Sequence, residues 1–264
     1  MTIPKKDAYH WLSCMTYNMQ VGAGTARPRH YVSRGWRQLL PSRASHTNLR
    51  HIARLLREFD IVGLQEIDAG SWRTRQHNQV EHLAALAGFV YWHTQINRDF
   101  GRFAQHGLGL LSRITPNFIE EHTLPGNIPG RGALLAYFTQ GQTTLAVAVA
   151  HLSLGARSRM AQIEALAGLV SEVDHGIILA DSNCSGQALT ANPALRKIGL
   201  RSNSPSLPSY PSWQPRRDLD HIICTSKLKT RPARVPDVRL SDHRPVCQMI
   251  ACPAGVLKAP TSPV

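Results

Sequence analysis

Short apolar runs followed by polar or acidic residues recur along this chain. Such runs, bounded by polar positions, predict buried strands; they cover 12–17, 61–64, 145–150, 177–180 and 221–224. The polar clusters beside them or further along are Tyr17-Asn18, Gln65-Glu66-Ile67-Asp68, His151-Leu152, Asp181-Ser182-Asn183, Asp218-Leu219-Asp220-His221 and Ser241-Asp242-His243. A carboxylate directly after a buried strand emerges at a sheet edge on a rigid element, so we expect these clusters to face one cleft.

Carboxylates placed in this way suit a hard cation. Mg²⁺ takes oxygen ligands, usually one or two carboxylates with waters and substrate phosphate oxygens. Glu66, Asp181 and Asp242 are therefore candidate ligands. Taken singly, each cluster has a structural interpretation as well, since Asp, Ser and Asn also form turns and helix caps. Their joint occurrence in order favours the site.

Two other segments, 47–59 and 160–173, show helical spacing of apolar positions. Between them a further helix is expected over 78–88, ending at Gly88. The segment from Gly22 to Ser45 is rich in Gly and Arg without a period, which predicts a long loop over the mouth of the site. We expect the helices to cover the outer faces of the sheets.

Length and composition indicate one soluble domain. The 264 residues are 42% hydrophobic, enough for a single large core. We expect an N-terminal extension over 1–11, the domain over 12–252 and a disordered Pro-rich tail over 253–264. The five cysteines are scattered, and no apolar run approaches the ~18 residues of a membrane span. We therefore expect a cytoplasmic protein, and a monomer, without a disulfide framework.

The chain is strongly basic, with a formal net charge of +13 and a pI near 10.1. Such a field attracts anionic partners and raises their encounter rate. Nucleic acid, phospholipid surfaces and phosphorylated small molecules all fit, and peripheral membrane contact stays open. A solvated basic face without a polymer partner is the alternative interpretation.

In their residues and in their order along the chain, these clusters resemble the motifs of the endonuclease/exonuclease/phosphatase (DNase I-like) superfamily, and in part those of a poorly characterised bacterial subgroup of it. The resemblance covers about Met15 to Val246. The matching pieces are Thr16-Tyr17-Asn18, Asp60 to Glu66, Gly109 to Arg113, Ala150-His151-Leu152, Ala180 to Asn183, Leu219 to Ile222 and Ser241 to Val246. The resemblance implies a four-layer α/β sandwich, with two mainly antiparallel sheets packed face to face and helices outside.

The resemblance also implies roles for these residues. Asn18, Glu66 and Asp242 would hold or complete a Mg²⁺ or Mn²⁺ site. Asp181 and Asn183 would orient the attacking water and the phosphoryl group. His243 paired with Asp220, together with His151, would serve proton transfer or phosphate stabilisation, and which histidine gives the proton stays open. Gln20 stands where some nuclease members carry a second acidic ligand, so a two-ion site has less support.

Three segments beside this set are expected to select the substrate: 97–107, 125–132 and 205–217. Arginine presents a planar fork suited to phosphate oxygens. The candidate substrate-binding residues are Arg98, Arg102, His106, Arg131 and Trp213. Tyr210, Trp213 and the Arg216-Arg217 pair lie just before Asp220, so an aromatic ring and two cations are expected to border the cleft, where the ring could stack on a base. The alternative interpretation is that Trp213 packs the loop down and that the arginines of these segments are ordinary solvated loop charges.

These observations predict a Mg²⁺- or Mn²⁺-dependent hydrolase of a phosphodiester, with a nuclease on DNA or RNA as the leading hypothesis. The alternative enzyme is a phosphatase or phosphodiesterase acting on a phospholipid headgroup, an inositol phosphate or another small phosphorylated molecule. A non-catalytic module that binds anionic ligands is the further alternative, although it would have no need of the complete polar set.

Overall fold

The computed structural model describes residues 9–24, 43–127, 129–202 and 206–253. Most of the predicted N-terminal extension, most of the loop over 22–45 and nearly all of the predicted tail therefore lie outside the described residues. The strands are β1 (Tyr9–Asn18), β2 (Ile61–Asp68), β3 (Tyr91–Asp99), β4 (Gln105–Ser112), β5 (Phe118–Thr123), β6 (Gly132–Gln140), β7 (Thr143–His151), β8 (His175–Asp181), β9 (Leu200–Ser202), β10 (Asp220–Thr225), β11 (Lys229–Thr230) and β12 (Val246–Pro253). The helices are η1 (Gln20–Gly22), α2 (Arg43–Leu56), η3 (Trp72–Thr74), α3 (Gln79–Ala87), α4 (Ala156–Ser171), α5 (Gly186–Ala191) and α6 (Pro193–Lys197).

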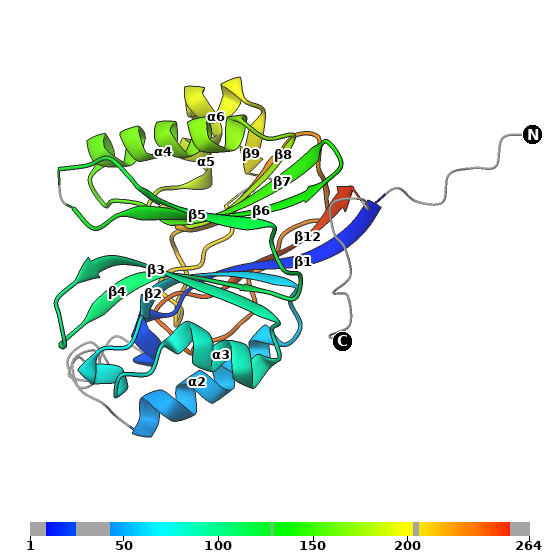
Figure 1. The fold of residues 1–264 in the computed structure, drawn as a ribbon. Helices are drawn as coiled ribbons and strands as arrows, with labels where there is room; N and C mark the ends of the chain where they lie inside the picture. The colour runs from blue at the N-terminus through cyan, green and yellow to red at the C-terminus, as the bar shows by residue number, and fades with distance from the viewer. Residues whose placement is uncertain (1–8, 25–42, 128, 203–205, 254–264) are drawn as a thin grey trace, which may run out of the picture.

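Two six-stranded sheets stack face to face, with helices on both outer faces (Figure 1). One sheet has the order β11-β12-β1-β2-β4-β3, and the other has the order β5-β6-β7-β8-β10-β9. The β1–β2 and β7–β8 pairs are parallel, and the remaining pairs are antiparallel. This arrangement confirms the predicted four-layer sandwich.

The alternation of side chains along β2 shows how the layers are joined. Ile61 is buried between the sheets, whereas Val62 and Leu64 pack towards α2 and α3. Gly63 faces the opposite sheet, where a Cβ atom would lie 2.8 Å from Cβ of Leu179. A side chain at this position would therefore push the two sheets apart.

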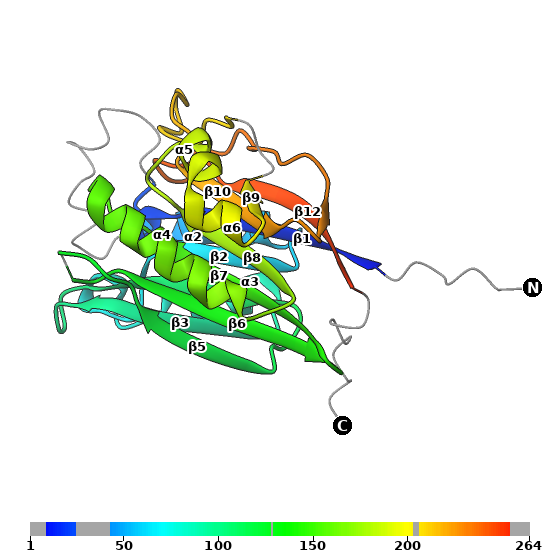
Figure 2. The same cartoon turned by 90° about the horizontal axis from the view of Figure 1, so that it is seen from above.

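The helices cover the sheets as expected. Helices α2 and α3 pack on the first sheet, and α4, α5 and α6 pack on the second (Figures 1 and 2). Helix α3 is capped at its N-terminus by Asn78, whose side chain accepts hydrogen bonds from the backbone of Val80 and Glu81, and at its C-terminus by Gly88, with φ +76°. No helix in the described part of the chain is long and apolar enough to cross a membrane.

Several boundaries differ from the sequence prediction. Strand β1 begins at Tyr9 because Tyr9 pairs with Pro253 of β12, so part of the predicted extension, and the first residue of the predicted tail, belong to the sheet. Helix α2 ends at Leu56 rather than Phe59, and helix α4 covers Ala156–Ser171 rather than 160–173. Helical periodicity locates the apolar face but does not fix the ends of a helix.

The sheet topology brings the polar clusters to one edge of the sandwich. Asn18 pairs with Gln65 across the parallel β1–β2 ladder, so β1 and β2 end side by side. In the second sheet, Asp181 pairs with His151 on one side and with Asp220 on the other. The strand ends that the sequence associates with chemistry are therefore neighbours in space.

Candidate active site

Asp181 lies at the centre of the polar edge. Its Oδ2 atom lies 3.5 Å from Nε2 of His151 and 3.9 Å from Nε2 of His243. The same oxygen accepts a hydrogen bond from Nδ2 of Asn18, at 3.0 Å, which reaches across from the other sheet. One carboxylate oxygen thus faces two histidines and an amide.

Glu66 reaches the site through a β-bulge. The register between β2 and β4 shifts between Gln65 and Ile67, and Glu66 has a φ of +52°. A bulge adds one residue to a strand and redirects a side chain. Here Gln65 stays buried between the sheets, where its Nε2 atom donates to Leu179 O at 3.3 Å, and Glu66 turns towards the cleft.

Asn18 joins the two carboxylates. Its Nδ2 atom donates to Oε1 of Glu66 at 3.1 Å as well as to Asp181, and its Oδ1 atom accepts from the backbone of Gln20 at 3.1 Å. The side chain is almost completely buried. Asn18 therefore holds two acidic groups near each other, which stabilises a pair that would otherwise repel.

His243 is oriented by two residues behind it. Its Nδ1 atom lies 2.8 Å from Oδ2 of Asp220, and the same oxygen accepts a hydrogen bond of 2.5 Å from Ser209 Oγ. The ring of Tyr210 packs against the imidazole, with centroids 4.8 Å apart. Asp220 and Ser209 are both buried, so the imidazole is fixed from its Nδ1 side.

The two histidines differ in their protonation. Burial lowers the pKa of His151 to about 4, assisted by Arg131 and opposed by Asp181. Burial also lowers the pKa of His243, but the charges of Asp220 and Asp181 and the hydrogen bond to Asp220 outweigh it, and the pKa rises well above the usual value. At neutral pH, His151 is neutral and His243 is charged.

Glu66 also carries a perturbed pKa. Burial raises the pKa of this carboxyl, and the charges of Asp242 and Asp181 raise it further, against the hydrogen bond from Asn18. Asp242 is itself buried, and its Oδ1 atom accepts from Ser241 Oγ at 3.1 Å. Carboxylates gathered around Glu66 in this way form a site that favours a cation.

Asn183 closes the cleft on the side of the second sheet. It has a φ of +52°, a conformation that asparagine tolerates better than most residues. Its Nδ2 atom donates to Leu152 O at 2.8 Å, and its backbone NH donates to Oδ1 of Asp181 at 3.2 Å. These bonds connect the loops that follow β7 and β8.

The polar groups line a cleft made of two adjoining cavities of about 210 and 240 Å³. Glu66, Arg131 and His151 line both. The first cavity is lined by Glu66, Arg131, His151, Leu154, Asp181, Asn183, Tyr210, Arg217, Leu219, Asp242 and His243, and the second adds Asn97, Arg98, Phe100, His106, Gly107, Leu108 and Gly130. The site therefore continues from the acidic groups towards the β3–β4 connection.

Arg131 lies between two glycines that allow close packing. A Cβ atom on Gly130 would lie 2.2 Å from Cγ of Arg98, and one on Gly132 would lie 2.3 Å from Oδ1 of Asn97. Burial lowers the pKa of Arg131, while Asp181 and Glu66 raise it. The guanidinium stays charged at the wall of the cleft.

The predicted substrate-binding residues fall into two groups. Arg98, His106 and Arg131 line the cleft. Arg102 is exposed on the β3–β4 turn, and neither Arg102 nor Trp213 lines either cavity of the cleft. Burial lowers the pKa of His106 to about 4, assisted by the charge of Arg73, so this histidine is a neutral wall of the cleft rather than a cation.

Two residues that support the site have no role in the prediction from the sequence. Ser209 supports Asp220 but belongs to an ordinary polar loop sequence, and only its buried contact distinguishes it. Asp68 lies two residues after Glu66, where its side chain accepts from Ser71, Gly70 and Arg73. The Nη1 atom of Arg73 in turn lies 3.4 Å from Nε2 of His106, so this ion pair supports the wall of the cleft.

The donor set fits a divalent cation. Asp181, Asp220 and His243 form a buried group whose ligand atoms lie within 4.8 Å of one another. Because Asp220 and Nδ1 of His243 already bind each other, Asp181 is the member of this group that is best placed to face a cation. Glu66 and Asp242 line the same cavity and add two more carboxylates, the oxygen donors that Mg²⁺ and Mn²⁺ prefer.

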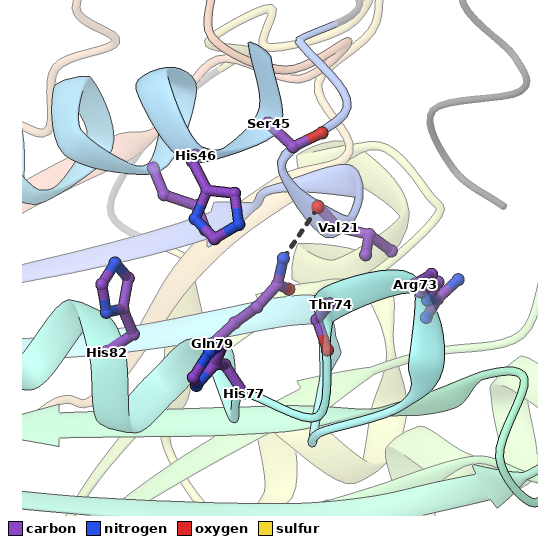
Figure 3. A pocket seen from close by; sticks show the side chains of 9 residues that line it. Val21, Ser45, His46, Arg73, Thr74, His77, Gln79 and His82 are labelled. Atoms are coloured by element: carbon purple, nitrogen blue, oxygen red, sulfur yellow. Dashed lines mark hydrogen bonds between the residues drawn. The ribbon is translucent and has the colours of Figure 1, made fainter. Parts of the chain in front are cut away.

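A separate cavity of about 110 Å³ lies between η1, α2 and α3 (Figure 3). His46, His77 and His82 line it, and the rings of His46 and His82 meet edge to face with centroids 6.4 Å apart. The Nε2 atom of Gln79 donates to Val21 O at 2.8 Å across its wall. This cavity shares no lining residue with the cleft.

Comparison with solved structures identifies the same fold in other proteins. An endonuclease/exonuclease/phosphatase from Beutenbergia cavernae DSM 12333 is 18% identical, over 93% of this chain and 72% of that one, with a TM-score of 0.69. A mannosyl-6-phosphatase from Bacteroides thetaiotaomicron VPI-5482 is 16% identical, over 90% and 99%, with a TM-score of 0.66. The human Nocturnin catalytic domain with bound sulfate is 16% identical, over 95% and 99%, with a TM-score of 0.64.

A comparison with curated proteins gives no match. Residues 15–243 match the Endonuclease/Exonuclease/phosphatase family. Members of this family are hydrolases that act on phosphoester bonds. This match includes every residue discussed above for the acidic edge, from Asn18 to His243. The chain therefore belongs to the endonuclease/exonuclease/phosphatase family.

Proposed function

We propose that this protein is a divalent-metal-dependent phosphodiesterase and that its substrate is DNA or RNA. One observation carries the proposal: Glu66, Asp181, His151, His243 and Arg131 line a single cavity. That cavity offers carboxylates for a cation, one neutral and one charged histidine, and a guanidinium. These are the groups that hydrolysis of a phosphoester requires.

Glu66 and Asp242 would hold the Mg²⁺ or Mn²⁺ ion, and Asn18 would fix Glu66 relative to Asp181 through its two hydrogen bonds. A divalent cation in this place would neutralise the charge that develops on the phosphoryl group and lower the pKa of a bound water. The Nδ2 atom of Asn18 can bridge Glu66 and Asp181 because the Oδ1 atom of the same amide is held by a hydrogen bond from the backbone NH of Gln20.

The remaining residues act on the water and on the phosphoryl group. The carboxylate of Asp181 can accept a proton or a hydrogen bond from the attacking water, with Asn183 beside it. His243, charged and fixed by Asp220, can donate from Nε2 to a phosphoryl oxygen. Arg131 can bind a second such oxygen, and the neutral ring of His151 completes the wall next to Asp181.

Charge and shape support a polymeric substrate. The net charge of +13 attracts nucleic acid strongly. The cleft also continues from the acidic groups to Arg98 and Phe100, beyond the space that a single phosphate occupies. A nucleic-acid strand, which carries a phosphate on both sides of each nucleotide, would occupy this part of the cleft.

The second candidate is a phosphatase or phosphodiesterase that acts on a sugar phosphate, an inositol phosphate or a phospholipid headgroup. The size of the acidic cavity, about 210 Å³, suits one small phosphorylated molecule. The similarity of fold to a mannosyl-6-phosphatase supports the same idea.

A compartment can be proposed in addition: all five cysteines are free, which supports a cytoplasmic location.

The test is turnover of bis-p-nitrophenyl phosphate and of p-nitrophenyl phosphate with Mg²⁺ or Mn²⁺, followed by assays on plasmid DNA and RNA. We expect diester cleavage that Asp181→Asn abolishes and that Glu164→Gln, an exposed carboxylate on α4, leaves unchanged. Activity on nucleic acid should fall steeply with added salt. Monoester turnover alone would select the phosphatase, and no turnover of any of these substrates would refute the proposed function.

A further inference from the structure

Three aromatic side chains are exposed beside the cleft. Trp72 is 52% exposed, Phe100 is 56% exposed and Phe103 is 76% exposed. Folding leaves their apolar surface in water, and a cluster of exposed apolar groups near a site indicates a binding surface. They come from η3 and from the turn between β3 and β4.

Backbone hydrogen bonds hold the three residues in one unit. The NH of Phe103 donates to Phe100 O at 3.4 Å, and the NH of Phe100 donates to Ala104 O at 2.9 Å, which closes the β3–β4 turn. The NH of Trp72 donates to Arg102 O at 2.6 Å and attaches η3 to the same turn. The aromatic residues thus lie on neighbouring backbone segments.

This unit is continuous with the cleft. Phe100 lines the same cavity as Glu66 and His151, and its ring meets that of His106 edge to face, with centroids 6.2 Å apart. Figure 1 shows the β3–β4 and β5–β6 connections at the same end of the two sheets, and Arg98 Nε donates to Pro129 O at 2.9 Å between them. A ligand that leaves the cleft in this direction meets Phe100, and the backbone segments that carry Trp72 and Phe103 lie next to it.

The surface also carries positive charge. Arg98 and Arg102 alternate with the two phenylalanines along the turn. The one acidic residue between Arg98 and Ala104 is Asp99, whose Oδ1 atom accepts from the backbone of Gly101 at 2.7 Å. Interleaved aromatic and cationic side chains match a ligand of alternating flat rings and anions.

We propose that Trp72, Phe100 and Phe103 stack on unpaired bases, so that the protein binds single-stranded nucleic acid with one phosphate in the cleft. This proposal rests on the proposed function and names its preferred substrate. Every base has a face that can stack on an aromatic ring, but in a duplex those faces are already covered. Single strands are therefore preferred to duplexes.

A membrane surface is the competing partner, since aromatic side chains also insert between lipid headgroups. Two observations favour nucleic acid. Phe100 lines the cleft and does not only project from the tip of the β3–β4 turn. In addition, residues 99–104 contain no Leu, Ile, Val or Met that would add aliphatic surface.

The experiment measures binding of a fluorescein-labelled twelve-residue oligothymidylate by anisotropy, in EDTA so that no cleavage occurs. We expect Trp72→Ala, Phe100→Ala and Phe103→Ala each to raise the Kd about fivefold or more, because each removes one stacking partner. Phe103→Trp should retain tight binding. Trp92→Ala is the matched control, since Trp92 is an exposed aromatic on β3 that lines neither cavity of the cleft.

Two controls use other ligands: the same sequence annealed to its complement should bind more weakly than the single strand, and any binding of phosphatidylglycerol vesicles, which the net charge of +13 favours, should be unchanged in the three alanine variants. Equal binding by all variants, tighter binding of the duplex, or vesicle binding that depends on the three aromatic residues would overturn the proposal.

Hydrolysis of bis-p-nitrophenyl phosphate separates the stacking surface from the proposed function. A wild type that hydrolyses this diester but ignores the oligonucleotide refutes only the stacking surface. A wild type that binds the oligonucleotide through the aromatic residues but hydrolyses nothing refutes only the enzyme.

Discussion

The Nδ1 atom of His243 lies 2.8 Å from Oδ2 of Asp220, while Nε2 of the same ring lies 3.9 Å from Oδ2 of Asp181. Because a carboxylate oxygen accepts hydrogen bonds, Nδ1 is the donor to Asp220, and Nε2 is left to face the cleft. The two aspartates come from paired positions on neighbouring strands, β8 and β10. The sheet register thus sets the direction of the imidazole.

The first prediction concerns the pair formed by His243 and Asp220. Asp220→Asn should lower kcat by roughly 10² to 10⁴-fold, because an amide can no longer fix the charged imidazole and its tautomer. Steady-state hydrolysis of bis-p-nitrophenyl phosphate measures the change. Ser209→Ala is the matched variant: it removes the other donor to the same oxygen and should cost far less. Equal losses in the two variants would contradict the role of Asp220.

The second prediction is that the pKa values of the two site histidines are shifted in opposite directions. In metal-free protein, NMR of the imidazole carbons should show His151 neutral down to a pH of about 4 and His243 charged well above pH 6.5. Asp220→Asn should move the midpoint of His243 down. A shared midpoint near the unperturbed value of ~6.5 would refute the electrostatic description.

These shifts have opposite consequences for stability. The pKa of His243 is higher in the folded than in the unfolded chain, so its contribution is complete below a pH of ~6.5 and is lost as the pH rises through the folded pKa. The pKa of His151 is lower in the folded chain, so protonation of the unfolded chain destabilises the fold as the pH falls from ~6.5 towards 4.

The third prediction concerns Asp68 behind the cleft. Asp68→Asn should reduce the free energy of unfolding by about 3 kcal/mol, because it removes the carboxylate that pairs with the buried guanidinium of Arg73. Urea unfolding at pH 7 measures the loss, with Glu164→Gln on the surface as the control. A loss below about 0.5 kcal/mol, the size of an ordinary surface change, would contradict the prediction.

The pH dependence of that loss follows from the pKa of Asp68. Burial raises this pKa, but hydrogen bonds from Ser71 and Gly70 and the charge of Arg73 outweigh burial and lower it below the usual value. The stabilisation is therefore present above the unfolded pKa of ~3.9 and is lost as the pH falls through the folded value. The difference between wild type and Asp68→Asn should shrink in unfolding experiments at pH 3.

Much of this arrangement could be predicted from the sequence. Apolar runs predicted the central strands, and the polar residues beside them predicted a shared edge. His151 and Asp181 end the parallel strands β7 and β8, and Asp220 begins the antiparallel neighbour β10. The hydrogen bond that Asp181 accepts from Asn18, in the opposite sheet, was not predicted from the sequence. Local pattern alone does not specify which sheet receives which strand.

Other features depend on contacts that no local pattern carries. The bulge at Glu66 is defined by pairing with β4, and an extra residue is invisible until the partner strand is known. Tyr210 and Arg217 line the cleft whereas Trp213, in the same segment, does not. The backbone of Ser212 donates to Asp242 O at 2.7 Å, and this tertiary contact determines how the segment lies.

The last prediction uses two glycines with the same backbone requirement. Gly130 and Gly141 have φ values of +95° and +60°, so alanine at either position should strain the backbone and cost about 1 kcal/mol of stability. Only at Gly130 would the new Cβ atom also meet Arg98, at 2.2 Å from its Cγ, whereas nothing lies within 4 Å at Gly141. Arg98 would have to leave the wall of the cleft, and its hydrogen bond to Pro129 O would be lost. Gly130→Ala should therefore raise KM severalfold for an oligonucleotide substrate, while Gly141→Ala should lower Tm without changing KM. Thermal unfolding and steady-state kinetics on both variants separate the two effects, and an unchanged KM in Gly130→Ala would show that Arg98 does not bind the substrate.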